Sequence, residues 1–331
     1  MGLAEPVTSR LFPLDQKMVQ SCCCNDALAP GLSRRDLLLR FAWVAGVLVF
    51  NAGAGMAASL LKRSIPRTGD LLPVVGLGTW QTFDVSPSAQ APLREVLREF
   101  ARLGGSVIDS SPMYGNSESV LGALAAELGI RSQLFLATKV WTRGREAGIQ
   151  QMEESLRRLR VQRIDLMQVH NLVDWRTHLV TLRRWKDQNR IRYIGVTHYT
   201  ASAYDELSSV LETQDLDFVQ LNYSIIERDA ERRLLPLALD RQIGVVVNRP
   251  FAEGALFRKV RGKSLPAWAK QIGCATWSQF FLKFIVSHPA VTCVIPATSK
   301  AEHLLDNMQG GIGPLPDPDT RERMVRYVAE A

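Results

Sequence analysis

Four residues of this chain have side chains that could together deliver a proton. They are Asp109 and Tyr114 in IDSSPMYG, Lys139 at the end of LATK, and His170 at the end of LMQVH. A lone tyrosine, with a pKa of about 10, is a poor acid at neutral pH. A nearby ammonium lowers that pKa, and a carboxylate holds the ammonium charged. A histidine can donate a hydrogen bond to a carbonyl oxygen. The set therefore predicts an acid for an oxygen that gains negative charge.

Hydride addition to an aldehyde or ketone needs such an acid. The hydride must come from a cofactor, because no side chain supplies one. Each residue alone has an ordinary alternative: Asp109 could cap a turn, Tyr114 could belong to one, and Lys139 could be a solvated charge. His170 could pair with Asn171 in a core. Their order along the chain favours the chemical interpretation.

The elements that would position these residues alternate along the chain. Short β-rich runs follow one another after residue 62, separated by longer amphipathic stretches such as 149–159, whose apolar spacings of three, four and three predict a helix. A looser leucine pattern at 234–239 is interrupted by Pro236. The expected strands are 74–79, 106–109, 134–139, 164–170, 191–197, 218–222, 244–248 and 293–296.

This alternation predicts an α/β fold with parallel strands joined by crossover helices. Eight such units over roughly 250 residues predict a (β/α)₈ TIM barrel. The competing doubly wound sheet would need a glycine-rich phosphate loop after its first strand. Here Gly76 and Gly78 are followed by TWQ, with no third glycine, so the barrel is favoured. In a barrel the strand ends share one face, so the four residues can converge.

The sequence resembles the aldo-keto reductases over about 74–307. The motifs are GLGTW, IDSSPMYGNSE, ATK, SLRRLRVQRIDLMQVH, IRYIGVTHY, QLNYS and IPATSKAEHLLDN. The resemblance implies an NAD(P)-dependent oxidoreductase that reduces aldehydes or ketones to alcohols, or catalyses the reverse. It makes Tyr114 the acid/base and Asp109, Lys139 and His170 its partners. A non-catalytic NADP-binding sensor or regulatory subunit on the same barrel is the alternative function.

The resemblance also implies where the cofactor binds. Thr197 and His198 stand where the family usually has Ser-Asn for the nicotinamide carboxamide, and Gln220 should contact that same group. Asn248 replaces a tyrosine that commonly stacks on the nicotinamide. The adenosine end would meet Thr298, Ser299, Lys300, His303, Asp306 and Asn307.

The choice between cofactors depends on the last loop. The hydroxyls of Thr298 and Ser299 and the charge of Lys300 suit a 2′-phosphate. His303 stands where the family often has an arginine, so the expected preference for NADP is modest and NAD is the alternative.

Trp80 and Trp141, each after an expected strand end, are candidate walls for a small-molecule carbonyl substrate.

The net charge of +7 is spread thinly, without a Lys/Arg block typical of nucleic-acid binding. The sequence shows no metal-ligand spacing. A barrel hydrolase, a third functional class, would require paired catalytic carboxylates or a set of metal ligands at the strand ends. The informative strand ends carry lysine, tyrosine and histidine instead.

Residues 1–58 are interpreted as a leader and 59–331 as the barrel. SRRDLL at 33–38 resembles a twin-arginine export signal, and the uncharged run that follows ends in small residues at 54–58. We therefore expect recognition by the twin-arginine machinery and a periplasmic or exported protein. An uncut membrane anchor and a cytoplasmic protein are the alternatives. The long segment before Arg34 is also explained by a start site assigned too far upstream of Met18.

The export hypothesis predicts that replacing Arg34 and Arg35 with lysine keeps the protein in the cytoplasm, because the receptor reads the arginine pair. Cell fractionation would show wild type cut near 57–59 and exported, and the variant uncut. If both proteins stay soluble, uncut and cytoplasmic, the signal interpretation is wrong.

Overall fold

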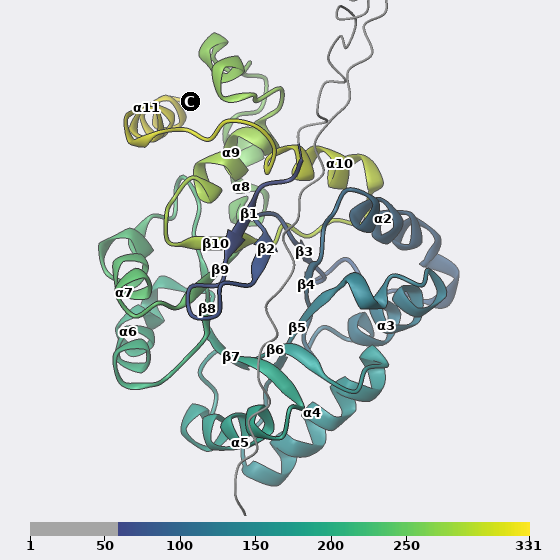
Figure 1. Ribbon diagram of the computed structural model, residues 1–331. Coiled ribbons are helices and arrows are strands. Elements are labelled where there is room, and N and C mark those ends of the chain that lie inside the picture. The colour runs from purple at the N-terminus through teal and green to yellow at the C-terminus, as the bar shows by residue number, and fades with distance from the viewer. Residues whose placement is uncertain (1–58) are drawn as a thin grey trace, which may run out of the picture. The chain divides into compact units, whose positions relative to one another are not determined.

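The computed structural model describes residues 59–331, and they form a barrel of eight parallel strands surrounded by helices (Figure 1). The strands follow sequence order around the sheet from β3 to β10. Bridges from Val75 to Val294 and from Gly78 to Ala297 join the two ends. The strands are β3 (Leu77–Gly78), β4 (Val107–Asp109), β5 (Phe135–Val140), β6 (Ile164–His170), β7 (Ile191–Thr197), β8 (Phe218–Asn222), β9 (Gly244–Asn248) and β10 (Val291–Val294).

The helices lie outside this ring, and most connect consecutive strands. They are α2 (Ala91–Arg102), α3 (Ser117–Glu127), α4 (Arg145–Leu159), α5 (Trp175–Asp187), α6 (Tyr204–Thr213), α7 (Leu234–Asp240), α8 (Ala255–Lys259), α9 (Trp277–Val286), α10 (Ala301–Gln309) and α11 (Pro318–Ala329). Short 3₁₀ turns are η1 (Pro87–Ala89), η2 (Arg131–Gln133), η3 (Ala201–Ala203), η4 (Asp229–Arg232), η5 (Ala252–Gly254) and η6 (Ala267–Ile272). None of the helices between residues 59 and 331 is long and apolar enough to cross a membrane.

Local sequence explains these elements. On α4 the residues Met152, Leu156 and Leu159 are buried, as their spacing predicts. Pro236 is the third residue of α7. Backbone N–H groups in the first turn of a helix have no acceptor within the helix, so a proline there removes no helical hydrogen bond. The leucine pattern around it therefore forms a regular, short helix.

The inner face of the barrel changes from apolar to polar along the strands. Alternate residues of a strand point to the same face. The inward apolar residues near the strand starts form one buried cluster, which includes Val107, Phe135, Ala137, Leu166, Tyr193 and Phe218. Two or four residues further along these strands stand Asp109, Lys139, Gln168, His170, Thr197 and Gln220. The polar groups therefore gather at the carboxyl ends of the strands.

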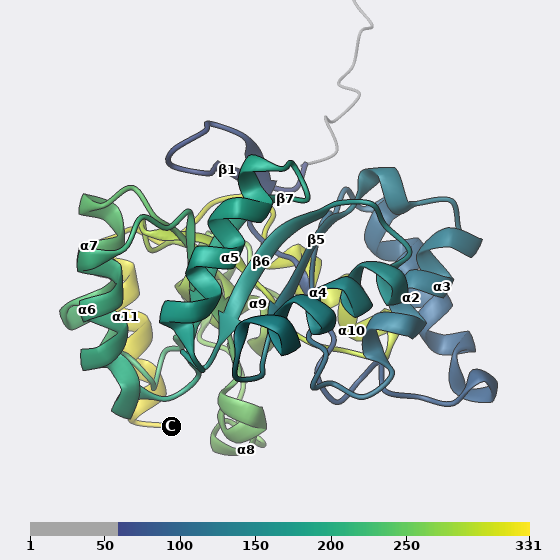
Figure 2. The same ribbon diagram turned by 90° about the horizontal axis from the view of Figure 1, so that it is seen from below.

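A hairpin closes the opposite end of the barrel. Strands β1 (Lys62–Ser64) and β2 (Leu71–Pro73) pair antiparallel, and Ile65 and Leu72 belong to the interior apolar cluster. Arg63 donates to the carbonyl of Val286 at 3.0 Å and to that of His288 at 2.8 Å, which ties the hairpin to the end of α9. In Figure 2 the hairpin and α8 lie at opposite ends of the barrel.

The structure confirms the predicted (β/α)₈ class and all eight barrel strands, with ends that differ by up to three residues. The hairpin and the short helix α8 after β9 were not predicted. Each hairpin strand has three residues, too few to show an alternating pattern. The leader with its twin-arginine motif lies outside the described residues, and the boundary after residue 58 stays a prediction.

Candidate active site

A buried ion pair lies at the centre of the polar end of the barrel. The ammonium nitrogen Nζ of Lys139 donates to Asp109 Oδ2 at 2.5 Å and to the carbonyl oxygen of Ser110 at 2.8 Å. Lys139 is fully buried and Asp109 nearly so. The Lys139 Nζ lies 5.0 Å from the centre of the Tyr114 ring, and the His170 ring centre is 5.9 Å from that of Tyr114. The structure thus brings all four residues together.

The Lys139 ammonium and the Asp109 carboxylate are both surrounded by further hydrogen-bond partners. Burial alone would lower the pKa of Lys139, but Asp109 and Tyr114 outweigh it and raise that pKa above its usual value. Gln168 and Gln220 donate from their amide nitrogens to Asp109 Oδ1 at 3.0 and 2.8 Å. Gln168 was missed by sequence reasoning. The sequence feature that could have indicated Gln168 is a polar residue within an apolar strand, two positions before His170.

Tyr114 keeps its proton at neutral pH. Burial raises the pKa of its hydroxyl; the Lys139 ammonium lowers it by a smaller amount, and the net direction is upward. This is opposite to the expectation that the ammonium would bring the pKa below its ordinary value, because desolvation outweighs the charge. A protonated Tyr114 can act as an acid toward an oxygen that gains charge.

The turn that carries Tyr114 is held from the segment after β3. The carboxylate of Asp84 accepts from the backbone N–H of Asn116 at 2.9 Å and from its side-chain amide at 3.1 Å. Gly115 has a φ of +58°, and a Cβ there would lie 2.2 Å from Asp84 Oδ2. A glycine is therefore required next to Tyr114.

His170 is neutral across the physiological range. Burial first, and then the charge of Lys139 and the nearby His198, lower the pKa of its imidazole to about 2. Its Nδ1 lies 3.2 Å from the hydroxyl oxygen of Ser111. The Trp141 ring centre is 6.4 Å from that of His170, so this predicted wall borders the site.

The loop that carries Trp141 is fastened by side chains from α4 and α5 and from the residue before α5. Gln151 accepts from the Trp141 N–H at 2.5 Å and donates to its carbonyl at 3.2 Å. His178 donates to the Thr142 carbonyl at 2.8 Å, and Asp174 accepts from the Gly144 N–H at 2.8 Å. Trp80 lies on the segment after β3, and Trp80 and Trp141 are each 42% exposed. Both predicted walls therefore have surface open to a substrate.

Three of the predicted cofactor residues form one polar group beside Asp109. The Gln220 carbonyl Oε1 accepts from Thr197 Oγ1 at 3.3 Å and from the Asn248 amide at 3.4 Å. The side-chain oxygen of Asn248 is buried and has no hydrogen-bond partner within the described residues. His198 stacks on Tyr199, with ring centres 5.7 Å apart. Gln220 itself is occupied by Asp109, so Asn248 offers the free polar atom.

The six predicted cofactor residues after β10 form two sets that differ in their hydrogen-bond partners. Ser299 is exposed, and the side chains of Lys300 and His303 are 63% and 61% exposed; Glu302 Oε1 lies 3.8 Å from Lys300 Nζ and 3.8 Å from His303 Nε2. Thr298 is buried, and its hydroxyl accepts from the Lys300 N–H at 3.1 Å. Asp306 and Asn307 instead accept hydrogen bonds from Thr276, Gln279 and Ser278, which join α10 to α9. The cofactor role of all six stays a prediction.

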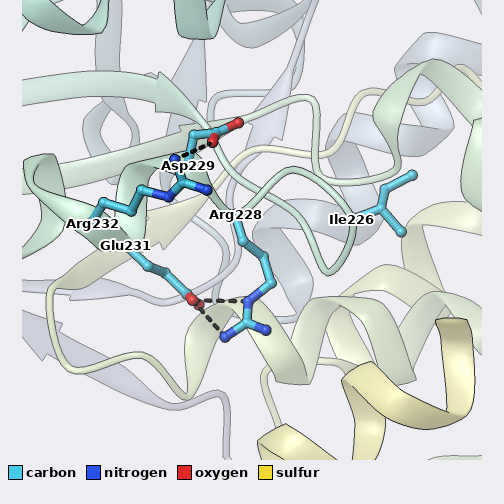
Figure 3. A pocket seen from close by; sticks show the side chains of 5 residues that line it. All are labelled: Ile226, Arg228, Asp229, Glu231 and Arg232. Carbon is cyan, nitrogen blue, oxygen red and sulfur yellow. Dashed lines mark hydrogen bonds and ion pairs between the residues drawn. The ribbon is translucent and has the colours of Figure 1, made fainter.

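An open surface pocket of about 450 Å³ lies in the segment after β8 (Figure 3). Its charges are paired: Arg228 contacts Glu231 at 2.6 Å and Glu322 of α11 at 3.0 Å, and Arg232 lies 3.9 Å from Asp229. These pairs connect the β8 segment with α11, so we assign the pocket a structural role. No group of three or more His, Cys, Asp or Glu side chains arranged for a metal ion occurs in residues 59–331.

Residues 59–331 thus form a (β/α)₈ barrel with Asp109, Lys139 and His170 near the carboxyl ends of its strands and Tyr114 in the turn after β4. The model of the aldo/keto reductase family matches residues 74–322, and the chain belongs to that family.

Curated relatives of the chain are named as reductases. The chain is 30% identical over 214 residues to the aldo-keto reductase YhdN of Bacillus subtilis, a match that covers 60% of this chain and 64% of that protein. It is 29% identical over 257 residues to the methylglyoxal reductase YeaE of Escherichia coli, covering 74% of this chain and 88% of the relative. The chain thus spans just under two thirds of the Bacillus protein.

Solved structures confirm the fold. An aldo/keto reductase from Klebsiella pneumoniae, determined with NADP and acetate, superposes with a TM-score of 0.66 at 24% identity, covering 78% of this chain and 93% of the other. The glycerol dehydrogenase of Gluconobacter oxydans gives a TM-score of 0.67 at 21% identity, covering 81% and 94%.

The low pKa of His170 predicts a pH dependence of stability. The unfolded chain binds a proton at this imidazole below about pH 6.5, whereas the folded protein binds it only near pH 2. Stability therefore falls with falling pH in that window, by about 1.4 kcal/mol per pH unit for this group. Denaturant unfolding at several pH values should show a steeper loss for wild type than for His170→Asn. Equal slopes would contradict the assignment.

Proposed function

We propose that the protein is an NAD(P)H-dependent reductase of aldehydes or ketones in which Tyr114 supplies the proton. The observation that carries this is the position of the Tyr114 ring, 5.0 Å from the buried Lys139 Nζ and 5.9 Å from the His170 ring centre. Membership of the aldo/keto reductase family supports it.

The chain's own residues would divide the work as follows. A bound nicotinamide supplies the hydride. The Tyr114 hydroxyl donates its proton to the carbonyl oxygen as negative charge develops there. Lys139 stabilises the tyrosinate that remains, since an adjacent ammonium favours the anion. Asp109, held by Gln168 and Gln220, keeps Lys139 charged and in place. His170, being neutral, orients the carbonyl as a hydrogen-bond donor.

The residues present suit a nicotinamide cofactor. The side-chain oxygen of Asn248, at the end of β9, is buried and has no hydrogen-bond partner within the described residues. Such an oxygen can accept a hydrogen bond from the N–H of a carboxamide. The side chains of Lys300 and His303 are exposed and follow Thr298 and Ser299 in the same segment, which combines hydroxyls with a positive charge, the groups that bind a phosphate. NADP in the Klebsiella structure supports this choice. An Escherichia coli relative named NADH-specific methylglyoxal reductase, 28% identical, keeps NAD as the alternative.

The substrate would be a small carbonyl compound placed between Trp80 and Trp141. The methylglyoxal reductases among the relatives support this class. For residues 1–58 we propose the export role, which rests on the twin-arginine motif alone.

The first prediction concerns the acid. Tyr114→Phe removes the proton but keeps the ring, so turnover of a carbonyl panel with NADPH should fall by about 10²- to 10⁴-fold. Cofactor affinity, measured by fluorescence titration, should stay near that of wild type. Turnover within severalfold of wild type would show that another group protonates the product.

The second prediction concerns the 2′-phosphate. Lys300→Ala should weaken NADPH binding by about tenfold, the order of one charge-assisted hydrogen bond, and NADH binding much less. The matched control is Lys62→Ala, an exposed lysine of the hairpin at the closed end of the barrel. Equal losses for the two cofactors would mean that Lys300 does not contact the phosphate.

A further inference from the structure

We propose that Ser111 is a positioning residue that fixes the tautomer of His170, so that the imidazole presents its Nε2 proton to the substrate oxygen. The proposal deepens the proposed carbonyl reduction and, for its role in catalysis, rests on it. Neither residue identity nor spacing indicated this contact, because the two residues are 59 positions apart.

Ser111 lies two residues after Asp109, in the turn that carries Tyr114. It is fully buried, and its backbone carbonyl accepts from the Tyr114 N–H at 3.0 Å. Its hydroxyl oxygen lies 3.2 Å from His170 Nδ1 and 3.4 Å from the backbone nitrogen of Met113. The same residue therefore contacts the segment of the acid and the ring of the histidine.

The hydrogen-bonding capacity of these groups decides the direction of the contact. The Met113 N–H can only donate, so it uses a lone pair of the Ser111 oxygen and leaves the hydroxyl proton free. A buried hydroxyl needs an acceptor. Within residues 59–331, the other hydrogen-bonding group in contact with this hydroxyl is His170 Nδ1. Ser111 therefore donates and Nδ1 accepts.

A neutral imidazole has one nitrogen that donates and one that accepts. Burial and the ammonium of Lys139 keep His170 neutral. With Nδ1 accepting from Ser111, the single ring proton is on Nε2. In the opposite tautomer the Nε2 lone pair would face the substrate side and repel a carbonyl oxygen.

This assignment gives Ser111 an effect on catalysis without contact to the substrate. Tyr114 and His170 lie edge to face, with an interplanar angle of 84°. In the proposal, the Tyr114 hydroxyl and the His170 Nε2–H both donate to one carbonyl oxygen, as electrostatic stabilisation of a developing oxyanion requires. Loss of the Ser111 hydroxyl would let both tautomers populate and would weaken one of the two donors.

The test is the tautomer itself, measured by ¹⁵N NMR of the histidine side chains in Ser111→Ala. The chain has five histidines, so a His170→Asn variant assigns the His170 signals directly. Ser110→Ala is the matched control for folding and for the NMR signal. Ser110 is equally buried, but its hydroxyl pairs with Thr79 and does not contact His170.

Wild type and Ser110→Ala should show an unprotonated Nδ1 and a protonated Nε2, and Ser111→Ala a mixture of the two forms. For carbonyl reduction, kcat of Ser111→Ala should fall by about tenfold, the order of one hydrogen bond, with little change in cofactor affinity. A proton on Nδ1 in wild type, or an unchanged tautomer in Ser111→Ala, overturns the proposal.

The NMR readout needs no substrate. If Tyr114→Phe keeps its turnover while Ser111 controls the tautomer, the proposed acid is wrong and the role of Ser111 in positioning His170 stands.

Discussion

The contact between Lys139 and Asp109 is the constraint on which the rest of the site depends. Two charges removed from water carry a large desolvation cost, which close contact and further hydrogen bonds must offset. Asp109 meets this requirement with donors from Lys139, Gln168 and Gln220, and Lys139 has the Ser110 carbonyl as a second acceptor. Loss of either charged partner would leave the other uncompensated, at about 3–5 kcal/mol. Stability and the proposed proton transfer therefore rest on the same atoms.

The position of this ion pair follows from the gradient inside the barrel. The half of the barrel interior at the strand starts is filled by apolar side chains, and the hairpin closes it through Ile65 and Leu72. These apolar side chains border the Lys139–Asp109 pair and lower the local dielectric constant. Electrostatic interactions at the carboxyl ends of the strands are therefore stronger. This explains why Tyr114 and His170 both shift in the direction of their neutral forms.

The sequence predicted the parts of the site that follow from order along the chain. Asp109 and His170 end strands and Lys139 is the last residue but one of β5, and parallel strands bring their carboxyl ends to one face. The contacts of Gln168, Ser111 and Asp84 were not predicted, because each joins side chains distant in the sequence. The direction of the Tyr114 pKa was also missed, because the extent of burial depends on the packed ring and its neighbours.

The fastening of the Trp141 loop has a consequence for how the protein could change over evolution. The polar groups that hold this loop bind its backbone and come from Gln151, Asp174 and His178, outside the strands that bear Asp109 and Lys139. A substitution at Trp141 therefore alters the surface offered to a substrate while the backbone keeps its anchors. Under the proposed function, exchange of this one side chain changes the range of compounds accepted, while the residues proposed to transfer the proton are inherited unchanged.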